Sequence, residues 1–355
     1  MQDQGSSCGD CLIAACRDAA GTVDIVQCFN GIEMASLQRR MLILDTDGGV
    51  DDAQALLMLI ASGRTPDAIT TVFGNVNLEA ATNNVLAVLT VAGKTEVPVH
   101  MGAGQPLVQP VIEASYIHGE DGMGGAPRPL SVPEPASSQG VEFLVSSLRA
   151  AAQAQDKIDI LMIGPLTNLA LALRIAPDCI AGIGQLTIMG GTVYGRGNTT
   201  PAAEFNIFAD PEAAAIVLGA EIETVMVPWE PCISHKMAGA DVDTLFDDLP
   251  ETKEKAFSLA LARHARQVIA GFGGGDNFRF VDPFAAAVVI EPDAVTKSIR
   301  ASVEVALAPG LTRGMTVVDP SGRLGTPMVT LVEEARMERL IALYRASIAH
   351  VGQKA

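Results

Sequence analysis

The sequence predicts one α/β domain with an open, mostly parallel central sheet flanked by helices. Two observations carry this prediction. From residue 41 onward, short runs that are apolar throughout alternate with helix-like stretches. Strands that are apolar on both faces are typical of a parallel sheet whose crossover helices cover both sides. After residue 41 the chain also lacks an internal repeat or a low-complexity linker that would divide it, so a single domain over residues 41–350 is expected.

The predicted elements follow in order along the chain. The expected strands are residues 41–44, 69–73, 97–100, 158–163, 186–189 and 224–227, and the expected helices are 51–62, 79–93, 140–155, 167–175 and 210–219. The C-terminal third is expected to contain a helix over 251–270, a glycine-rich loop over 271–276, a helix from near Asp282, a hairpin of 303–307 with 315–318, and a closing helix over 333–349. Ligands of such sheets bind outside the carboxyl ends of the strands, so the residues after each strand are the candidates for function.

Composition limits the class of partner. The chain has 355 residues, 48% of them hydrophobic, and a formal net charge of −17. Nucleic acids and anionic lipids attract clustered Lys and Arg, so this charge argues against both as partners. No apolar run approaches the roughly 18 residues of a membrane-spanning helix. A cytoplasmic protein that binds a neutral small molecule or a cation is expected.

The first 40 residues differ from the rest of the chain. They hold four of the six cysteines, namely Cys8, Cys11, Cys16 and Cys28. Cys8 and Cys11 form a CxxC pair that could seed a metal or redox site, but no second pair follows at ligand spacing. The favoured interpretation of residues 1–40 is an atypical leader, either disordered or lying upstream of the true start.

An acidic loop after the first predicted strand is the strongest chemical signal. It lies within the segment LILDTDGGVDDAQALLMLI, residues 42–60. Asp45 and Asp47 are two apart and so leave the strand on the same side, and Asp51 and Asp52 open the next helix. Four carboxylates within eight residues repel one another when ionised, so a bound cation is the simplest remedy.

Two other interpretations of this loop were weighed. If Asp51 and Asp52 were only helix caps, the glycines and the remaining acids at the edge of a parallel sheet would be unexplained. An EF-hand is excluded because, counted from Asp45, position six is Val50 instead of glycine and position twelve is Leu56 instead of glutamate.

The acidic loop resembles a family signature. DTDGGVDDAQAL is similar to the DxDPGxDDAxA form of inosine-uridine-preferring nucleoside hydrolases, with Gly48 in place of the proline. Further blocks resemble the family in order over residues 41–350: FGNVNLEAATNN (73–84), IHGEDGMGG (117–125), IGPLTNLA (163–170), IMGG (188–191), GNTTPAAEFNIFADPEAA (197–214), VDPFAA (281–286) and LTRGMTVVD (311–319). The resemblance implies the Rossmann-like nucleoside hydrolase fold and an oligomer, either a homodimer or a homotetramer.

The resemblance also implies a reaction and assigns roles to residues. The implied activity is hydrolysis of the N-glycosidic bond of ribonucleosides by a calcium-bound water, a reaction of nucleoside salvage and purine metabolism. Asp47 would be the general base, and the implied Ca²⁺ ligands are Asp47, Asp52, Asp282 and the carbonyl oxygen of Ile163. The residues implied to bind the ribose hydroxyls are Asp51, Asn75, Asn198, Glu204 and Asn206.

Several of these residues have a plainer interpretation. Asn75 could be a turn residue, and Asn168 and Asp282 could each cap a helix. Asp45 is expected to order the loop without touching the ion. Glu204 and Asn206 would share one side of the chain if their segment is extended, which favours a substrate role.

The chain departs from the family at the leaving group. Many members carry a histidine immediately before the last metal-binding aspartate, and this chain has Val281 there. That residue cannot protonate the departing base, so His118 and Trp229 are the candidates for assisting it, Trp229 by stacking on the base. Preference for purine or pyrimidine bases stays open.

Two alternatives to a nucleoside hydrolase were considered. The first is a magnesium-dependent phosphatase of the haloacid dehalogenase type, whose nucleophile would be the first aspartate of a DxDG motif. The paired Asp51 and Asp52 and the AEFN block argue against it. The second is a calcium-dependent nucleoside or ribose binding protein without turnover, an alternative motivated by Val281.

Overall fold

The computed structural model describes residues 39–349. Most of the predicted leader, including its CxxC pair, lies outside the described residues. Within them, no helix is long and apolar enough to cross a membrane. The elements from Leu42 to Ala349 are built on one nine-stranded sheet, in the order β10-β9-β11-β6-β5-β4-β1-β2-β3.

The sheet is mostly parallel. Its strands are β1 (Leu42–Thr46), β2 (Ala68–Thr71), β3 (Val99–Met101), β4 (Ile158–Met162), β5 (Ile183–Met189), β6 (Glu223–Val227), β9 (Val295–Val305), β10 (Thr316–Asp319) and β11 (Met328–Ala335). Neighbours from β11 through β6 to β3 pair in parallel, whereas β9 is antiparallel to both β10 and β11. Two short strands, β7 (Lys236–Ala238) and β8 (Asn277–Arg279), form a separate antiparallel pair.

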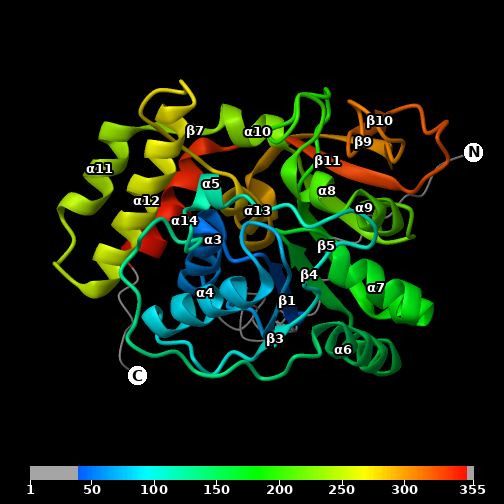
Figure 1. Ribbon diagram of the computed structural model, residues 1–355, viewed down its shortest axis with the longest axis horizontal. Coiled ribbons are helices and arrows are strands. Elements are labelled where there is room, and N and C mark those ends of the chain that lie inside the picture. Colours follow the sequence, from blue (N-terminus) through cyan, green and yellow to red (C-terminus); the bar gives the residue numbers. More distant parts are fainter. Residues whose placement is uncertain (1–38, 350–355) are drawn as a thin grey trace, which may run out of the picture. The chain divides into compact units, whose positions relative to one another are not determined.

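Helices cover both faces of the sheet (Figure 1). One face carries α3 (Val50–Ala61), α4 (Leu78–Val91), α12 (Lys253–Gly271), α13 (Asp282–Ile290) and α14 (Met337–Ala349). The other carries α6 (Gly140–Ala154), α7 (Thr167–Ile175) and α9 (Pro211–Leu218). The remaining α-helices are α5 (Ser115–His118), α8 (Phe205–Ala209), α10 (Trp229–Ser234) and α11 (Gly239–Asp247), and two 3₁₀ helices span Pro177–Gly182 and Pro292–Ala294.

The apolar strand pattern produces two cores. In β1, Leu42 and Leu44 pack into the cluster formed by α3, α4, α13 and α14, whereas Ile43 between them packs into the cluster formed by α6, α7 and α9. Successive strand side chains point to opposite faces, so a strand buried on both sides must be apolar throughout. The α/β class with a mostly parallel sheet, predicted from these runs, is confirmed.

The C-terminal third contains four strands or α-helices that were not predicted, namely β7, α11, β8 and β11. The hairpin is confirmed, because Thr316 pairs with Val305 and Asp319 with Ser302 in the antiparallel β9–β10 ladder. The closing helix was predicted to begin at residue 333, which is wrong: β11 continues to Ala335 and α14 begins at Met337. In the hairpin, the edge of β9 that faces away from β10 needs a hydrogen-bonding partner. β11 is that partner, and it lies between β9 and β6.

The turn after β1 depends on Gly48. This residue has φ of 67°, a conformation open to glycine and unfavourable for residues with a Cβ. A Cβ built at Gly48 would also lie 2.6 Å from the carbonyl oxygen of Ala81 in α4. The turn therefore requires glycine at this position in this chain.

Candidate functional site

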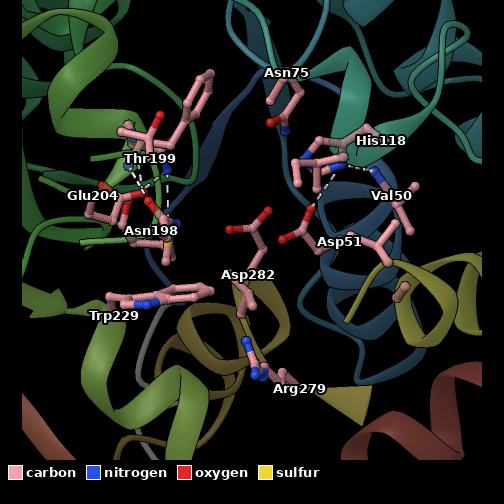
Figure 2. Close-up of a pocket in the computed structure, with 18 of the residues that line it drawn as sticks. Val50, Asp51, Asn75, His118, Asn198, Thr199, Glu204, Trp229, Arg279 and Asp282 are labelled. Atoms are coloured by element: carbon pink, nitrogen blue, oxygen red, sulfur yellow. Dashed lines mark hydrogen bonds and ion pairs between the residues drawn. The ribbon is translucent and has the colours of Figure 1, made fainter. Parts of the chain in front are cut away.

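A cavity of about 540 Å³ opens at the carboxyl ends of the parallel strands. Its volume is within the range of small-molecule sites. Nine of the residues singled out from the sequence line it: Asp51, Asn75, His118, Ile163, Asn198, Glu204, Asn206, Trp229 and Asp282. Asp47 and Asp52 are not part of the lining, and both are buried. Figure 2 shows Asp282 between Asn75 on one side of the cavity and Arg279 on the other.

Three carboxylates converge at the cavity. Oxygen atoms of Asp51, Asp52 and Asp282 lie within 4.8 Å of one another, although Asp282 comes from the start of α13 and the other two from the start of α3. The fold therefore brings together acids that are 230 positions apart in the chain. The sequence prediction placed Asp47 in this group and Asp51 on the ribose; the three that converge include Asp51 instead. This group could hold a metal ion.

Asp47 is held by Asn75. The backbone N–H of Asn75 donates to Oδ2 of Asp47 at 2.8 Å, and its side-chain amide donates to Oδ1 at 2.8 Å. The same amide nitrogen also donates to Oδ2 of Asp52 at 2.9 Å. Gly74 leaves room for this contact, because a Cβ there would lie 2.0 Å from Oδ2 of Asp47. Asn75 is thus more than the simple turn residue that was considered, since it joins two acids of the loop.

Burial and mutual repulsion raise the pKa values of the acids of the site. Burial raises the pKa of Asp47 well above its usual value, and the charge of Asp52 raises it further. Burial and the charges of Asp51, Asp52 and Asp47 likewise raise the pKa of Asp282. The pKa of Asp51 is raised by burial to about 6. Neighbouring buried carboxylates cannot all ionise unless a positive charge lies among them. The raised pKa values therefore indicate a site suited to a cation.

The donors present fit a divalent cation. Oδ1 of Asp51 is buried and accepts no hydrogen bond, and the side chain of Asp282 accepts none from any described residue. Asp282 was considered as a helix cap, but the N-cap of α13 is Val281 and no side-chain cap bond is present. Asp52 does cap α3, because it accepts from the N–H of Gly49 at 2.8 Å, and it also accepts from the hydroxyl of Thr46. Carboxylate oxygens with unused lone pairs are the ligands that hard cations prefer.

Asp45 lies behind the loop in a network of its own. It is fully buried and accepts hydrogen bonds from the hydroxyl of Thr70 and from the amide of Asn168, the latter at 2.8 Å. Asn168 also donates to the carbonyl of Thr71 and accepts from the N–H of Ala103. The interpretation of Asn168 as a helix cap is wrong, because α7 begins at Thr167 and Asn168 joins β1 to the end of β2 and to the segment after β3.

His118 borders the acidic loop. Its Nδ1 accepts from the N–H of Val50 at 3.1 Å and lies 3.6 Å from Oδ1 of Asp51. Burial lowers the pKa of His118 to about 4, so the imidazole is neutral at pH 7 with its proton on Nε2. A neutral imidazole with a free Nε2–H can donate a hydrogen bond into the cavity.

Glu204 and Asn206 sit at a helix start. The condition that their segment be extended is not met beyond Glu204, because α8 begins at Phe205. Glu204 caps this helix by accepting from the N–H of Asn206, and it also accepts from the N–H of Gly191; burial raises its pKa to about 7. The Asn206 amide donates to the carbonyls of Met189 at 3.1 Å and Ile163 at 3.3 Å. Asn198 accepts from the N–H of Phe205 at 2.8 Å and so fixes the loop in front of α8.

Part of the cavity lining is apolar. Trp229 and Val281 line it together with Ala265, Val268, Ile269 and Phe272 from the end of α12. Trp229 is partly buried, and it packs against the core as well as lining the cavity. Cys232 is fully buried.

Several polar residues of the cavity were missed by the sequence interpretation, namely Gln54, Tyr116, Thr199, His264 and Arg279. His264 lines it from α12, and its Nε2 hydrogen-bonds the carbonyl of Ile117 at 2.7 Å. Arg279 lines it from the end of β8. The only sequence signal for Arg279 was its position three residues before Asp282, in a segment for which no strand was predicted.

The fold and the site define an α/β enzyme with a carboxylate group suited to a metal ion, and comparisons identify its family. Residues 42–342 match the family model described as inosine-uridine preferring nucleoside hydrolase. The chain is 38% identical over 290 residues to a non-specific ribonucleoside hydrolase of Klebsiella pneumoniae, covering 81% of this chain and 91% of that one. It is 33% identical over 313 residues to a pyrimidine-specific ribonucleoside hydrolase of an Enterobacter species, covering 87% and 97%.

Solved structures give the same result. A plant nucleoside hydrolase superposes with a TM-score of 0.79 at 28% identity, covering 87% of this chain and 99% of that chain. A purine-preferring ribonucleoside hydrolase from Gardnerella vaginalis superposes with a TM-score of 0.80 at 26% identity, covering 89% and 100%. The chain belongs to the inosine-uridine preferring nucleoside hydrolase family and is a hydrolase of N-glycosyl bonds.

This family membership overturns the phosphatase alternative. The structure gives the physical reason: Asp45, the residue that would be the phosphatase nucleophile, is fully buried, hydrogen-bonded to Thr70 and Asn168, and absent from the cavity lining. A nucleophile must reach its substrate.

Proposed function

We propose that this enzyme hydrolyses ribonucleosides to ribose and free base, with Asp47 as the general base. The observation that carries the proposal is the orientation of Asp47 by Asn75 beside the group Asp51, Asp52 and Asp282, at a cavity whose lining divides into polar and apolar side chains. A nucleoside has the same division, because its ribose is a polyol and its base is a flat ring. The ribose would therefore lie at the acidic end and the base beside Trp229.

Ca²⁺ is the ion proposed for the acidic group. Asp47, Asp52, Asp282 and the carbonyl of Ile163 would hold it as the family resemblance implies, and the position of Asp51 adds a further carboxylate. Such an ion supplies positive charge that polarises a nearby water and binds vicinal hydroxyls. The raised pKa values of these carboxyls support this assignment, since a cation would keep them ionised at neutral pH.

Activation of the water and binding of the ribose would be carried out by different residues. Asp47 would take a proton from the attacking water as the water oxygen bonds to C1′ of the ribose and the base leaves with the electron pair of the C–N bond. Asp51, Asn75, Asn198, Glu204 and Asn206 would fix the ribose. Glu204 and Asn198 also hold backbone N–H groups, so their remaining lone pairs would make these contacts.

The departing base would be assisted by His118 and Trp229. Val281 offers no proton, whereas His118 offers an Nε2–H and Trp229 a ring face, and all three line the cavity. A hydrogen bond from a neutral imidazole stabilises a base that is gaining negative charge, and stacking on an indole makes the base ring easier to protonate.

The test is a screen for free ribose with inosine, guanosine, adenosine, uridine and cytidine. We expect release that disappears with a chelator, returns with Ca²⁺, and is lost in Asp47→Asn. Asp293→Asn is the matched control, because Asp293 is exposed and its side chain makes no hydrogen bond or ion pair to a described residue. Undiminished release in Asp47→Asn would overturn the role of Asp47.

A binding protein without turnover is the second candidate, favoured by Val281 alone. The single tryptophan of the chain, Trp229, lines the cavity and so reports on a bound base. Nucleoside titration that changes tryptophan fluorescence while no nucleoside yields ribose would support the binder. Ribose release from any of them would exclude it.

A further inference from the structure

We propose that Arg279 recognises the base of a 6-oxopurine nucleoside and stabilises it as it leaves. This inference rests on the proposed function and names the substrate class for the same cavity. Arg279 is the only Arg or Lys among the described residues that line the cavity. It ends β8 three positions before Asp282, so the loop that delivers the proposed metal ligand also delivers this cation.

The guanidinium of Arg279 has no partner among the described residues. Its Nε is buried without a hydrogen-bond acceptor, and the side chain makes no ion pair, in contrast to Arg266, Arg313 and Arg339, which each bind carboxylates. A buried donor left unsatisfied is costly, so an unpaired arginine in a ligand cavity indicates that the ligand supplies the acceptor. Burial lowers the pKa of Arg279, and no neighbouring carboxylate offsets this effect.

The location of Arg279 selects the base as its partner. Figure 2 shows it on the side of Asp282 away from Asn75. Besides Asp282, the lining residues near it include two apolar ones, Val281 and Ile269. A terminal nitrogen of Arg279 lies beside Ile269, because both are within 3.0 Å of a Cβ built at Gly274. Asp51, Asn75 and Glu204 are proposed to bind the ribose. The paired N–H donors of the Arg279 guanidinium therefore remain for the base.

The chemistry of the fork selects the class of base. A guanidinium donates two parallel hydrogen bonds to adjacent acceptors, which hypoxanthine and guanine present as O6 and N7. Adenine presents an amino group at C6, which donates, so one of the two bonds is lost. When the C–N bond breaks, the electron pair goes to the base, and in a 6-oxopurine the charge spreads to O6 and N7. Arg279 would stabilise that anion by hydrogen bonding, and solvent would then protonate it; this compensates for the absence of an acid at Val281.

The experiment compares three ribosides in Arg279→Met: inosine, adenosine and 4-nitrophenyl β-D-ribofuranoside. The last has a stable phenolate leaving group and no O6 or N7. We expect kcat/KM for inosine to fall about 10- to 100-fold, the discrimination of one bidentate pair. The value for the nitrophenyl riboside should change no more than in Arg263→Met, a control at an exposed arginine of α12. Adenosine keeps a single bond, at N7, so its value should fall less than that of inosine. Arg279→Lys, which keeps the charge but not the fork, should give an intermediate loss for inosine.

Each other outcome contradicts the proposal in a distinct way. A parallel fall for all three ribosides, with a lower melting temperature, would assign Arg279 a structural role at the end of α12. An unchanged kcat/KM for inosine in Arg279→Met, or full activity in Arg279→Lys, would show that the base does not accept paired hydrogen bonds from Arg279. If the wild-type protein cleaved none of the three ribosides, the proposed function itself would fail, and the assignment of Arg279 with it.

Discussion

Asn75 holds both oxygens of Asp47, one through its backbone N–H and one through its side-chain amide, each at 2.8 Å. These two bonds fix the plane of the carboxylate. They also come from the loop after β2, the strand beside β1, so the orientation of the proposed base is set by two neighbouring strands of the sheet. Orientation of a reacting group contributes to rate without touching the substrate's bonds.

Asn75→Ala is therefore expected to lower kcat. The variant keeps the backbone bond to Oδ2 but loses the amide that joins Asp47 to Asp52. Loss of such a supporting partner reduces activity or metal affinity by about 10- to 100-fold. Ribose release measured at saturating Ca²⁺ checks this. Asn77→Ala, which removes only the exposed cap of α4, should retain full activity; equal activity in the two variants would contradict the role of Asn75.

Calcium should stabilise the protein more at pH 8 than at pH 5. A carboxyl whose pKa is raised on folding favours the folded state when protonated, and this contribution is lost as the pH rises through the folded value. For Asp51 the window runs from 3.8 to about 6, and the pKa values of Asp47, Asp52 and Asp282 are also raised. Above this window the metal-free site holds unscreened charge, which a cation relieves.

Thermal unfolding of metal-stripped protein with and without Ca²⁺ measures this effect. The rise in melting temperature on adding Ca²⁺ should be larger at pH 8, and Asp282→Asn should reduce it. A rise of the same size at both pH values would show that the raised carboxyls are not the ligands.

Gly48→Pro restores the family's usual residue and should nevertheless destabilise this chain. Proline is confined to negative φ, whereas Gly48 has φ of 67°, and a Cβ would lie 2.6 Å from the carbonyl oxygen of Ala81. The expected cost in unfolding free energy is about 3 kcal/mol or more. Urea unfolding checks this, with the substitution Gly63→Ala as a control for a positive-φ glycine with open space around it. A variant as stable as the wild type would mean that the turn readily adopts another conformation.

Asn168→Ala should destabilise the fold more than a surface substitution. It removes a donor from Asp45 and from the carbonyl of Thr71, and an acceptor from the N–H of Ala103, all at a buried position. A buried group left unsatisfied costs about 1–3 kcal/mol. Urea unfolding should show that the free energy of unfolding falls by at least this amount. A fall no larger than that in Asp293→Asn would show that the hydrogen bonds of Asn168 do not stabilise the fold.

The sequence was informative wherever apolar pattern and local motif coincide. The parallel strands follow from runs that are apolar throughout, and the acidic loop follows from four acids within eight residues. β11 was missed because its last residues include the acidic pair Glu333 and Glu334, and acidic residues are also typical of the first turn of a helix. Local pattern does not specify which strand a segment will pair with.

The site was predicted less completely than the fold. The approach of Asp282 to Asp52 rested on the family resemblance, because no local pattern relates positions 230 apart. The place of Asp51 in the carboxylate group and the roles of Asn168 and Glu204 as a strand link and a helix cap depend on side-chain directions. Arg279 had no sequence signal of its own, since its significance lies in the absence of a partner among the described residues.

The most direct test of the account is to titrate metal-stripped protein with Ca²⁺ while measuring both bound Ca²⁺ and ribose release from inosine. The account predicts that activity appears in step with the binding of Ca²⁺ and that Asp282→Asn shifts both curves together to higher Ca²⁺ concentration. Ribose release at full rate without bound divalent metal, or an Asp282→Asn variant that binds Ca²⁺ and turns over like the wild type, would contradict it.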